Sequence, residues 1–259
     1  MYFDLLLPSV LFFVITGSIF LQRKLEDTLF SLLEEKKLNI REAALTVAWM
    51  GVAVTAVVFI PGEAIQILFL SAYSYMLFSF TYMALKKWYI AVFPPILFLS
   101  SYFFYWNLIV FNIFVIIFSM IITVYVSGLF SWKTVWIFAI LLTIMDVIQV
   151  FFTGFMGQSA TKMMELKLPV LLMLPTYPPG LTVGLGLGDL FLAGLLSIQT
   201  AEKRGVKAGV LTAATNSLAM FIFEVALLNT MFARFFPATL VVIAGSIMGL
   251  GATYLIKLG

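Results

Sequence analysis

Long apolar runs make up most of this chain, and their length constrains its fold more than any other feature. Each run has about 18 to 25 residues between charges, proline or asparagine, which is the length a helix needs to cross the hydrocarbon core of a bilayer. Apolar residues make up 63% of the chain and charged residues 10%, whereas about a quarter of residues are charged in soluble domains. We therefore expect an all-α integral membrane protein. The runs predict about nine spans: Tyr2–Leu21, Ala43–Ile60, Ala64–Leu85, Trp88–Trp106, Leu108–Phe130, Trp132–Gly154, Leu181–Thr200, Gly205–Asn229 and Phe235–Ile256.

No second domain or internal repeat is visible in the sequence. We expect a single polytopic membrane domain over residues 1–259, with helices one to five within 1–130 and helices six to nine within 131–259. The first run lacks the basic n-region and small-residue cleavage site of a secretory signal peptide, so we expect it to be retained as a span.

Cysteine and histidine are both absent from the sequence. Their absence excludes disulfides, a thiolate nucleophile, Cys or His metal sites and a haem with an axial histidine. It also excludes a serine–histidine dyad and an H-E-x-x-H zinc site, so only carboxylates remain for proteolysis inside a membrane. The net charge of +3 is small, and the basic residues lie at the ends of the runs, which argues against nucleic-acid binding. We expect no metal and no cofactor.

Two consecutive apolar runs each contain an aspartate near the middle, Asp146 and Asp189. A carboxylate near the bilayer centre costs about 2.5 to 3.5 kcal/mol, so each of these residues requires a reason. Consecutive spans are antiparallel, and each aspartate lies about eight residues, roughly 12 Å, from the end where the two runs connect. The two carboxyl groups are therefore predicted to lie at one depth.

Two carboxyl groups held together in a low-dielectric site share one proton and titrate as a unit. One can take a proton from water while the other donates a proton to a carbonyl oxygen, as in aspartic proteases. Two alternatives stay open. In one, the aspartates only hydrogen-bond polar neighbours such as Thr143, Gln149 or Thr182 and fix the helix register. In the other, they belong to the ion pathway of a membrane transporter, with acids spread through the membrane.

Three glycines, Gly184, Gly186 and Gly188, alternate with larger residues directly before Asp189. They weaken a helix at this point and leave the backbone bare beside the carboxylate. A substrate helix must unwind locally before its peptide bond can be attacked. A bare, non-helical stretch offers such a substrate both space and hydrogen-bond partners.

These residues resemble a known family. The stretch Gly186-Leu187-Gly188-Asp189 matches the G-x-G-D signature of the presenilin and signal peptide peptidase family of intramembrane aspartyl proteases, and Asp146 stands one span earlier, where that family has its other aspartate. The number of predicted spans agrees with the family over the whole chain. The motifs themselves fall within about residues 140 to 245. It implies a presenilin-like fold, a catalytic Asp146/Asp189 dyad that activates water, and a scaffold or substrate-binding role for Gly186, Leu187 and Gly188. Transmembrane peptides or proteins are then the substrates.

Two positions depart from the family motifs. The P-A-L motif falls at Pro237-Ala238-Thr239-Leu240, where threonine takes the position of leucine. The resemblance implies that these four residues form part of the active-site scaffold or the substrate-binding surface. Met145 replaces the tyrosine that precedes the first aspartate in the family, so a hydroxyl contact from that position is absent.

The connection between the two aspartate runs is predicted to begin with a short interfacial helix at Gly157–Lys167. An apolar run, Val170–Leu174, follows among prolines and favours an extended conformation over a helix. By the family resemblance this run is a strand that pairs with unwound substrate, and an ordinary loop is the alternative.

Glu224 is a third acid within an apolar run and has no counterpart in the family motifs. It lies about six residues, roughly 9 Å, from the membrane face nearest the aspartates. Pairing with Arg234 and contact with water at the helix end are two explanations for it. We do not expect a catalytic role.

Positive charge predicts the orientation of the chain. Only three of the 15 Lys and Arg residues, Lys162, Lys167 and Arg234, fall on the face that receives the amino terminus. By the positive-inside rule the amino terminus is exoplasmic and the carboxy terminus cytoplasmic. Signal peptide peptidases have this orientation and presenilins the reverse, so the preferred substrates are signal-peptide-like or type II segments. The lipid bilayer is the other expected partner. The oligomeric state stays open, and so does a catalytically silent relative that binds membrane helices.

Overall fold

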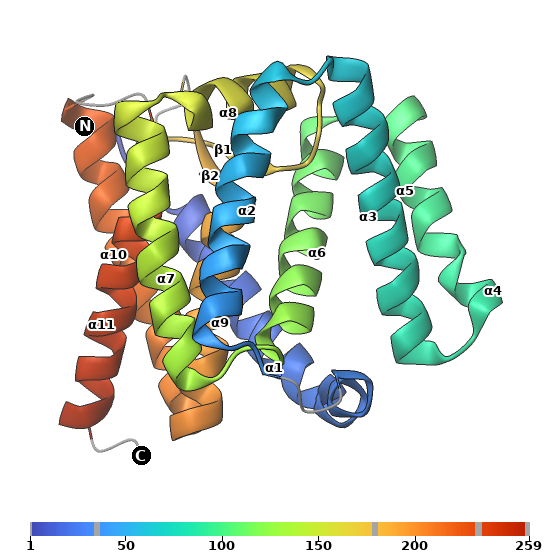
Figure 1. Ribbon diagram of the computed structural model, residues 1–259. Coiled ribbons are helices and arrows are strands. Elements are labelled where there is room, and N and C mark those ends of the chain that lie inside the picture. The colour runs from blue at the N-terminus through green and yellow to red at the C-terminus, as the bar shows by residue number, and fades with distance from the viewer. Residues whose placement is uncertain (1, 34–36, 178–180, 231–234, 257–259) are drawn as a thin grey trace.

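Helices that run back and forth along one direction make up most of the molecule (Figure 1). The structure, a computed structural model, describes residues 2–33, 37–177, 181–230 and 235–256. Each predicted run contains helix, so the expected helical class is confirmed, and one short hairpin accompanies the helices. The elements in chain order are α1 Leu6–Leu33, α2 Ile40–Phe59, α3 Gly62–Leu85, α4 Trp88–Ala91, α5 Phe93–Phe104, α6 Leu108–Ser127, α7 Trp132–Val147, the π-helix η1 Ile148–Phe152, α8 Phe155–Glu165, β1 Leu171–Pro175, β2 Thr182–Gly186, α9 Leu187–Arg204, α10 Val206–Thr230 and α11 Thr239–Leu255.

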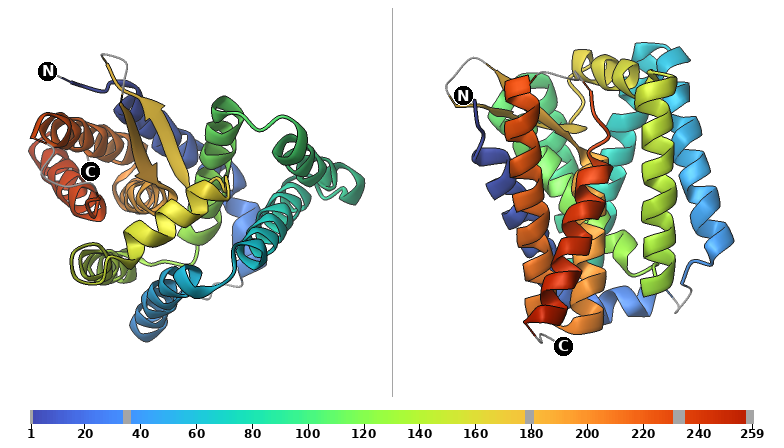
Figure 2. Two further views of the ribbon diagram at one scale, coloured as in Figure 1. Left: turned by 90° about the horizontal axis from the view of Figure 1, so that it is seen from above. Right: turned by 90° about the vertical axis from the view of Figure 1, so that its left-hand side faces the viewer.

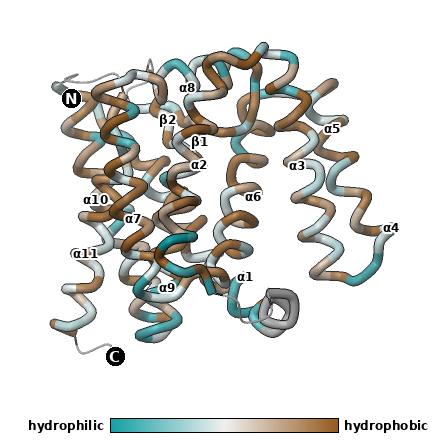
Figure 3. Tube along the Cα trace, viewed as in Figure 1, coloured by the Kyte–Doolittle hydropathy of each residue, from teal (hydrophilic) through white to brown (hydrophobic). Residues whose placement is uncertain are grey.

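Several of these helices are apolar enough for a membrane. Among the described residues, 6 segments have the length and composition to cross one: Leu6–Glu26, Ile40–Phe59, Gly62–Leu85, Leu108–Ser127, Trp132–Phe152 and Val206–Thr230. The segments Trp88–Phe104 and Thr239–Leu255 are apolar but shorter. Hydrophobic residues follow the middles of the helices, and hydrophilic residues gather toward their ends (Figure 3). The helices are compatible with a multi-pass membrane protein.

The run Leu181–Thr200 differs most from its prediction as a single span. Only the part from Leu187 onward is helical, because residues Thr182–Gly186 form strand β2. Glycine costs a helix interior about 1 kcal/mol relative to alanine, and Gly184 and Gly186 both lie in the strand. The glycines therefore delay the start of the helix to Leu187 and leave the preceding residues to pair with β1.

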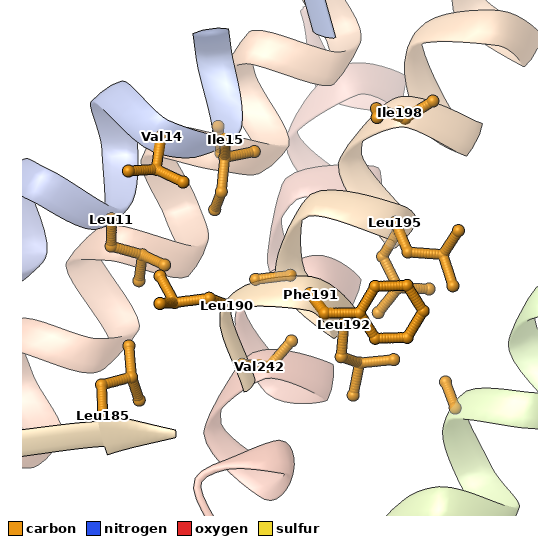
Figure 4. Close-up of a cluster of buried hydrophobic side chains, with 14 of the residues drawn as sticks. Leu11, Val14, Ile15, Leu185, Leu190, Phe191, Leu192, Leu195, Ile198 and Val242 are labelled. Atoms are coloured by element: carbon orange, nitrogen blue, oxygen red, sulfur yellow. The ribbon is translucent and has the colours of Figure 1, made fainter. Parts of the chain in front are cut away.

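Helix α9 lies in the centre of the bundle. Every residue from Leu190 to Thr200 is buried, and α9 contacts α1, α6, α7, α10 and α11. Because α9 is enclosed on all sides by close-packed neighbours, the position of Asp189 near its start is fixed by the core. Side chains from α1, β2, α9 and α11 form one cluster (Figure 4): Leu11, Val14, Ile15, Leu185, Leu190, Phe191, Leu192, Leu195, Ile198 and Val242.

Helices α3, α4 and α5 lie to one side of this bundle (Figure 2). An aromatic cluster joins α3 and α5 to α6: Tyr73, Phe98, Tyr102, Trp106, Phe114 and Phe118. The hydroxyl of Tyr102 donates to the carbonyl of Leu166 at 2.7 Å, and the indole N–H of Trp106 donates to the carbonyl of Lys167 at 2.9 Å. The cluster thereby holds the connection that follows α8.

Helix α8 and the β1–β2 hairpin close one end of the bundle (Figures 1 and 2). Helix α8 confirms the short helix expected at Gly157–Lys167, and β1 confirms the extended conformation of Val170–Leu174. The strands are antiparallel, with Leu171 opposite Gly186 and Met173 opposite Gly184. Pairing of β1 with a substrate stays a prediction.

The outer edge of β1 is occupied by a side chain of α6. The amide of Asn112 donates to the carbonyl of Met173 at 2.7 Å, and its Oδ1 accepts from the N–H of Met173 at 2.9 Å. In an antiparallel pair both backbone groups of a residue point to the same side, so Met173 does not bond its partner Gly184. The N–H and C=O of Gly184 therefore face away from β1, and no backbone bond on that side is found within the described ranges. The hairpin has one open edge, along β2.

Candidate active site

Asp146 lies at the end of α7 and is 5% exposed. The helix continues directly into the π-helix η1, where the N–H of Thr153 bonds to the carbonyl of Ile148 at 3.0 Å. Single π-helical turns inside α-helices are rare and occur frequently at functional sites. No pattern in the sequence predicts this turn, which begins two residues after the acid.

Asp189 is positioned by the direct passage from β2 into α9. Gly186 is the N-cap of α9, so Asp189 falls in the first turn, where the helix dipole favours a carboxylate. The backbone of Gly186 hydrogen-bonds the carboxylate of Asp189. A Cβ atom on Gly186 would lie 2.9 Å from Oδ2 of Asp189, which is closer than real Cβ contacts. Only glycine fits at Gly186 without moving the carboxylate.

The structure brings the two predicted acids together. Asp146 and Asp189 line one cavity of about 140 Å³. At about 30 Å³ per water molecule, this space holds a few waters and is too small for a helix. Apart from Glu224 and the two aspartates, the wall is apolar or glycine: Val150, Met156, Ala160, Leu171, Val183, Gly184, Leu185, Gly186, Met220, Phe223, Leu227, Phe235, Phe236, Pro237 and Ala238.

Thr239 contacts the dyad directly. It is the first residue of α11 and is 2% exposed, and its hydroxyl donates to Oδ2 of Asp146 at 3.0 Å. A hydrogen bond to a carboxylate is about twice as strong as a neutral one, so the hydroxyl stabilises negative charge on Asp146 and fixes its orientation. Thr239 is also the residue that departs from the P-A-L motif. The sequence predicted it as scaffold, and its contact with the acid depends on the packing of α11 against α7.

Three further predicted scaffold residues, Gly186, Pro237 and Ala238, line the cavity. Leu240 does not: it is 41% exposed. Successive residues of a helix point about 100° apart, so the orientation of Thr239 toward Asp146 turns Leu240 away from the site.

Leu187 and Gly188 are also not among the residues that line the cavity. The N–H of Leu187 bonds to the carbonyl of Val170 at 2.9 Å, and its side chain packs against the aromatic side of the core. Gly188 is exposed, and a Cβ atom there would meet open space. The two residues shape the start of α9 without contacting the cavity.

Two of the three polar neighbours predicted as alternative partners of the aspartates, Thr143 and Gln149, bond elsewhere. The hydroxyl of Thr143 donates to the carbonyl of Ala139 at 2.9 Å, and the amide of Gln149 donates to the carbonyl of Gly51 at 2.8 Å. Met145 also faces α2, with its sulfur next to Gly51. Gln149 and Met145 thus join the segment of α7 and η1 to α2, whereas the bond of Thr143 stays within α7.

Glu224 lines the same cavity as the aspartates, on α10. It is 3% exposed, so it does not lie at a solvated helix end, and its Oε2 has no hydrogen-bond partner among the described residues. Arg234, its other expected partner, lies outside the described residues. Sequence reasoning noted this acid and left it out of the site, although its place in an apolar run was a signal.

A larger groove of about 670 Å³ lies between α2 and α7 and is lined by Met145 and Gln149. It contains no acidic side chain from the described residues, so the carboxylate chemistry belongs to the smaller cavity. Within the same described ranges, no group of three His, Cys, Asp or Glu side chains is placed to hold a metal ion.

No protein-family model matches the chain, and no curated protein matches its sequence. The function must therefore be argued from the site and from the motif resemblance.

Proposed function

We propose that the chain is an intramembrane aspartyl protease of the presenilin and signal peptide peptidase type, which hydrolyses peptide bonds within transmembrane segments. One observation carries the proposal: Asp146 and Asp189, on different helices, line one small cavity. A single carboxylate in a membrane is costly, whereas a pair that shares one proton provides an acid and a base at the same point.

The proposed reaction begins with a water molecule between the two carboxyl groups. The ionised carboxylate takes a proton from the water as its oxygen bonds to the scissile carbonyl carbon, and the protonated carboxyl group donates to the carbonyl oxygen. The tetrahedral diol then loses the C–N bond as the nitrogen takes a proton from the dyad and an amine and a carboxylic acid form. Thr239 and Gly186 hold the two carboxyl groups in position for these steps.

The open edge of β2 offers backbone hydrogen-bonding groups to an extended substrate. Unwinding a transmembrane helix frees backbone N–H and C=O groups that have no water to bond within the bilayer. Gly184 exposes such groups along β2, and Gly184 and Asp189 line the same cavity. The edge of β2, rather than the occupied edge of β1, is the surface on which we expect substrate to pair.

The proposed topology has nine spans, with the amino terminus exoplasmic and the carboxy terminus cytoplasmic. Alternation of the helices supports it, since α10 runs toward the end that carries the hairpin and α11 runs away from it (Figure 1). The few basic residues near the hairpin, such as Lys162 and Lys167, support an exoplasmic assignment for that end. The dyad then opens toward the exoplasm, and signal-peptide-like or type II segments are the preferred substrates.

The ion-pathway alternative predicts acids distributed along a route through the membrane. Asp146, Asp189 and Glu224 instead line a single cavity, which favours catalysis. The presence of both aspartates favours an active protease over a silent relative.

The test is cleavage of a generic transmembrane peptide by the purified protein in liposomes, with and without an aspartyl transition-state mimic. We expect cleavage that the mimic blocks and that Asp146→Asn and Asp189→Asn each abolish. The double variant should be no less active than either single variant, because the dyad acts as a unit. Substantial activity in one single variant would contradict the shared-proton mechanism, and ion flux without cleavage would favour the transporter.

A further inference from the structure

Glu224 is a buried acid that the proposed reaction does not use. Its side chain lines the dyad cavity and is 3% exposed, and its Oε2 has no hydrogen-bond partner among the described residues. Buried polar groups in native proteins are nearly always paired, so an unpaired carboxyl oxygen beside a reaction centre requires an explanation.

The neighbouring side chains on the same face of α10 provide no hydrogen-bond partner for Glu224. Met220 and Leu227 lie one turn before and after Glu224 and line the cavity with it. Asp4 acts on Glu224 by like-charge repulsion, and its own carboxylate accepts from the N–H groups of Leu6 and Leu7 at 2.7 and 3.3 Å. An apolar side chain would fill this position more favourably if packing were the only requirement.

The charge of the cavity indicates what would satisfy Glu224. Three carboxyl groups line it, no basic side chain from the described residues does, and Asp4 adds negative charge nearby. A cation that enters such a low-dielectric space is stabilised by each of these carboxyl groups that is ionised, and it favours the ionised form of Glu224. A resident metal ion does not fit, because no metal-holding group of acids is found in the part of the chain that the structure describes. A basic side chain of the substrate supplies a cation of this kind.

We propose that Glu224 forms an acidic subsite that selects transmembrane substrates carrying a lysine or arginine close to the scissile bond. The proposal rests on the protease function proposed above and names the substrate class of the same cavity. The basic side chain pairs with the carboxylate of Glu224 while the neighbouring peptide bond lies between Asp146 and Asp189. The pairing fixes the register of an unwound segment that otherwise offers only apolar side chains.

The test uses the purified full-length protein in liposomes and a neutral transmembrane peptide. A single lysine is moved through successive positions on both sides of the cleavage site, and each lysine peptide is compared with a norleucine and a glutamate peptide of the same register. We expect one register at which kcat/KM for lysine exceeds that for norleucine by about tenfold or more and glutamate is disfavoured. Glu224→Gln should bring the lysine-to-norleucine ratio at that register close to one, whereas Glu224→Asp, which keeps the charge, should retain a clear preference.

Glu202→Gln is the matched control, because Glu202 lies on α9 outside the cavity and its loss should leave the ratio unchanged. Two results would refute the subsite alone. In one, the wild type cleaves the peptides but prefers lysine over norleucine at no position. In the other, the lysine-to-norleucine ratio of kcat/KM is unchanged in Glu224→Gln. Absence of cleavage of every peptide would refute the protease function and the subsite with it. If Glu224→Gln fails to fold, the register scan with the wild type still decides the question.

Discussion

The hydrogen bond from Thr239 to Asp146 gives the sharpest test of the dyad, because the hydroxyl that donates it can be replaced by a methyl group with little change in shape. Thr239→Val replaces the hydroxyl with a methyl group at a position that is 2% exposed. The donor to Oδ2 of Asp146, now at 3.0 Å, is lost, and no other side-chain donor to that carboxylate is found among the described residues. The negative charge on Asp146 then loses its stabilising partner.

Hydrogen bonds to charged groups contribute about 1.5 to 3 kcal/mol. At about 1.36 kcal/mol per factor of ten, the loss corresponds to a fall in kcat/KM of at most roughly 10- to 150-fold, reached where the whole contribution of the bond is to the transition state and none to the free enzyme. Thr239→Ser keeps the hydroxyl and should retain most of the activity. The assay is initial-rate cleavage of a fluorogenic transmembrane peptide in liposomes, with thermal unfolding of each variant measured in parallel.

Two results would refute this reasoning. Full activity of Thr239→Val would mean that the hydroxyl does not act on the dyad. Equal losses in Thr239→Val and Thr239→Ser, with unchanged unfolding temperatures, would mean that keeping the hydroxyl is not sufficient and that the hydrogen bond alone does not account for the loss.

Three further predictions follow from the site and its orientation. Cleavage should show a bell-shaped pH profile, because one carboxyl group must be protonated and the other ionised; a rate that keeps rising into alkaline solution would contradict a carboxylate dyad. Gly186→Ala should reduce kcat by about 100-fold, because its Cβ would displace the neighbouring carboxylate, whereas Gly188→Ala meets open space and should lose much less; similar losses in both would argue against the steric account. A reporter fused at Gly259 should be active only in the cytoplasm, and activity only outside the cell would reverse the proposed topology and substrate class.

The sequence predicted those features that depend on composition over many residues. The helical segments follow from the lengths of the apolar runs, and the pairing of Asp146 with Asp189 follows from the cost of placing each acid in such a run. The glycines before Asp189 predicted a non-helical stretch, and β2 occupies it. These predictions needed no knowledge of which side chains touch.

The features that the sequence did not predict depend on contacts between distant segments. Thr239 and Asp146 are 93 positions apart, and their bond exists because α11 packs against α7. Strand β2 required β1 as a partner, and the edge of β1 required Asn112, which belongs to another helix. Glu224 was visible as an intramembrane acid, but only the packing of α10 placed it in the wall of the dyad cavity.

The π-helical turn after Asp146 makes the length of this span as important as its side chains. A π-turn accommodates one residue more than an α-turn, so η1 sets the direction in which the chain leaves α7 and passes through Thr153 and Gly154 into α8. Deleting one residue within Ile148–Phe152 would shorten this end of the span and rotate the start of α8 against α7 by about 100°. Either Asp146 would leave the cavity or Gln149 and the start of α8 would leave their contacts. Substitutions in η1 change one side chain at a time, but a single deletion changes the direction of every side chain beyond it, so this span should tolerate exchange of residues far better than their loss.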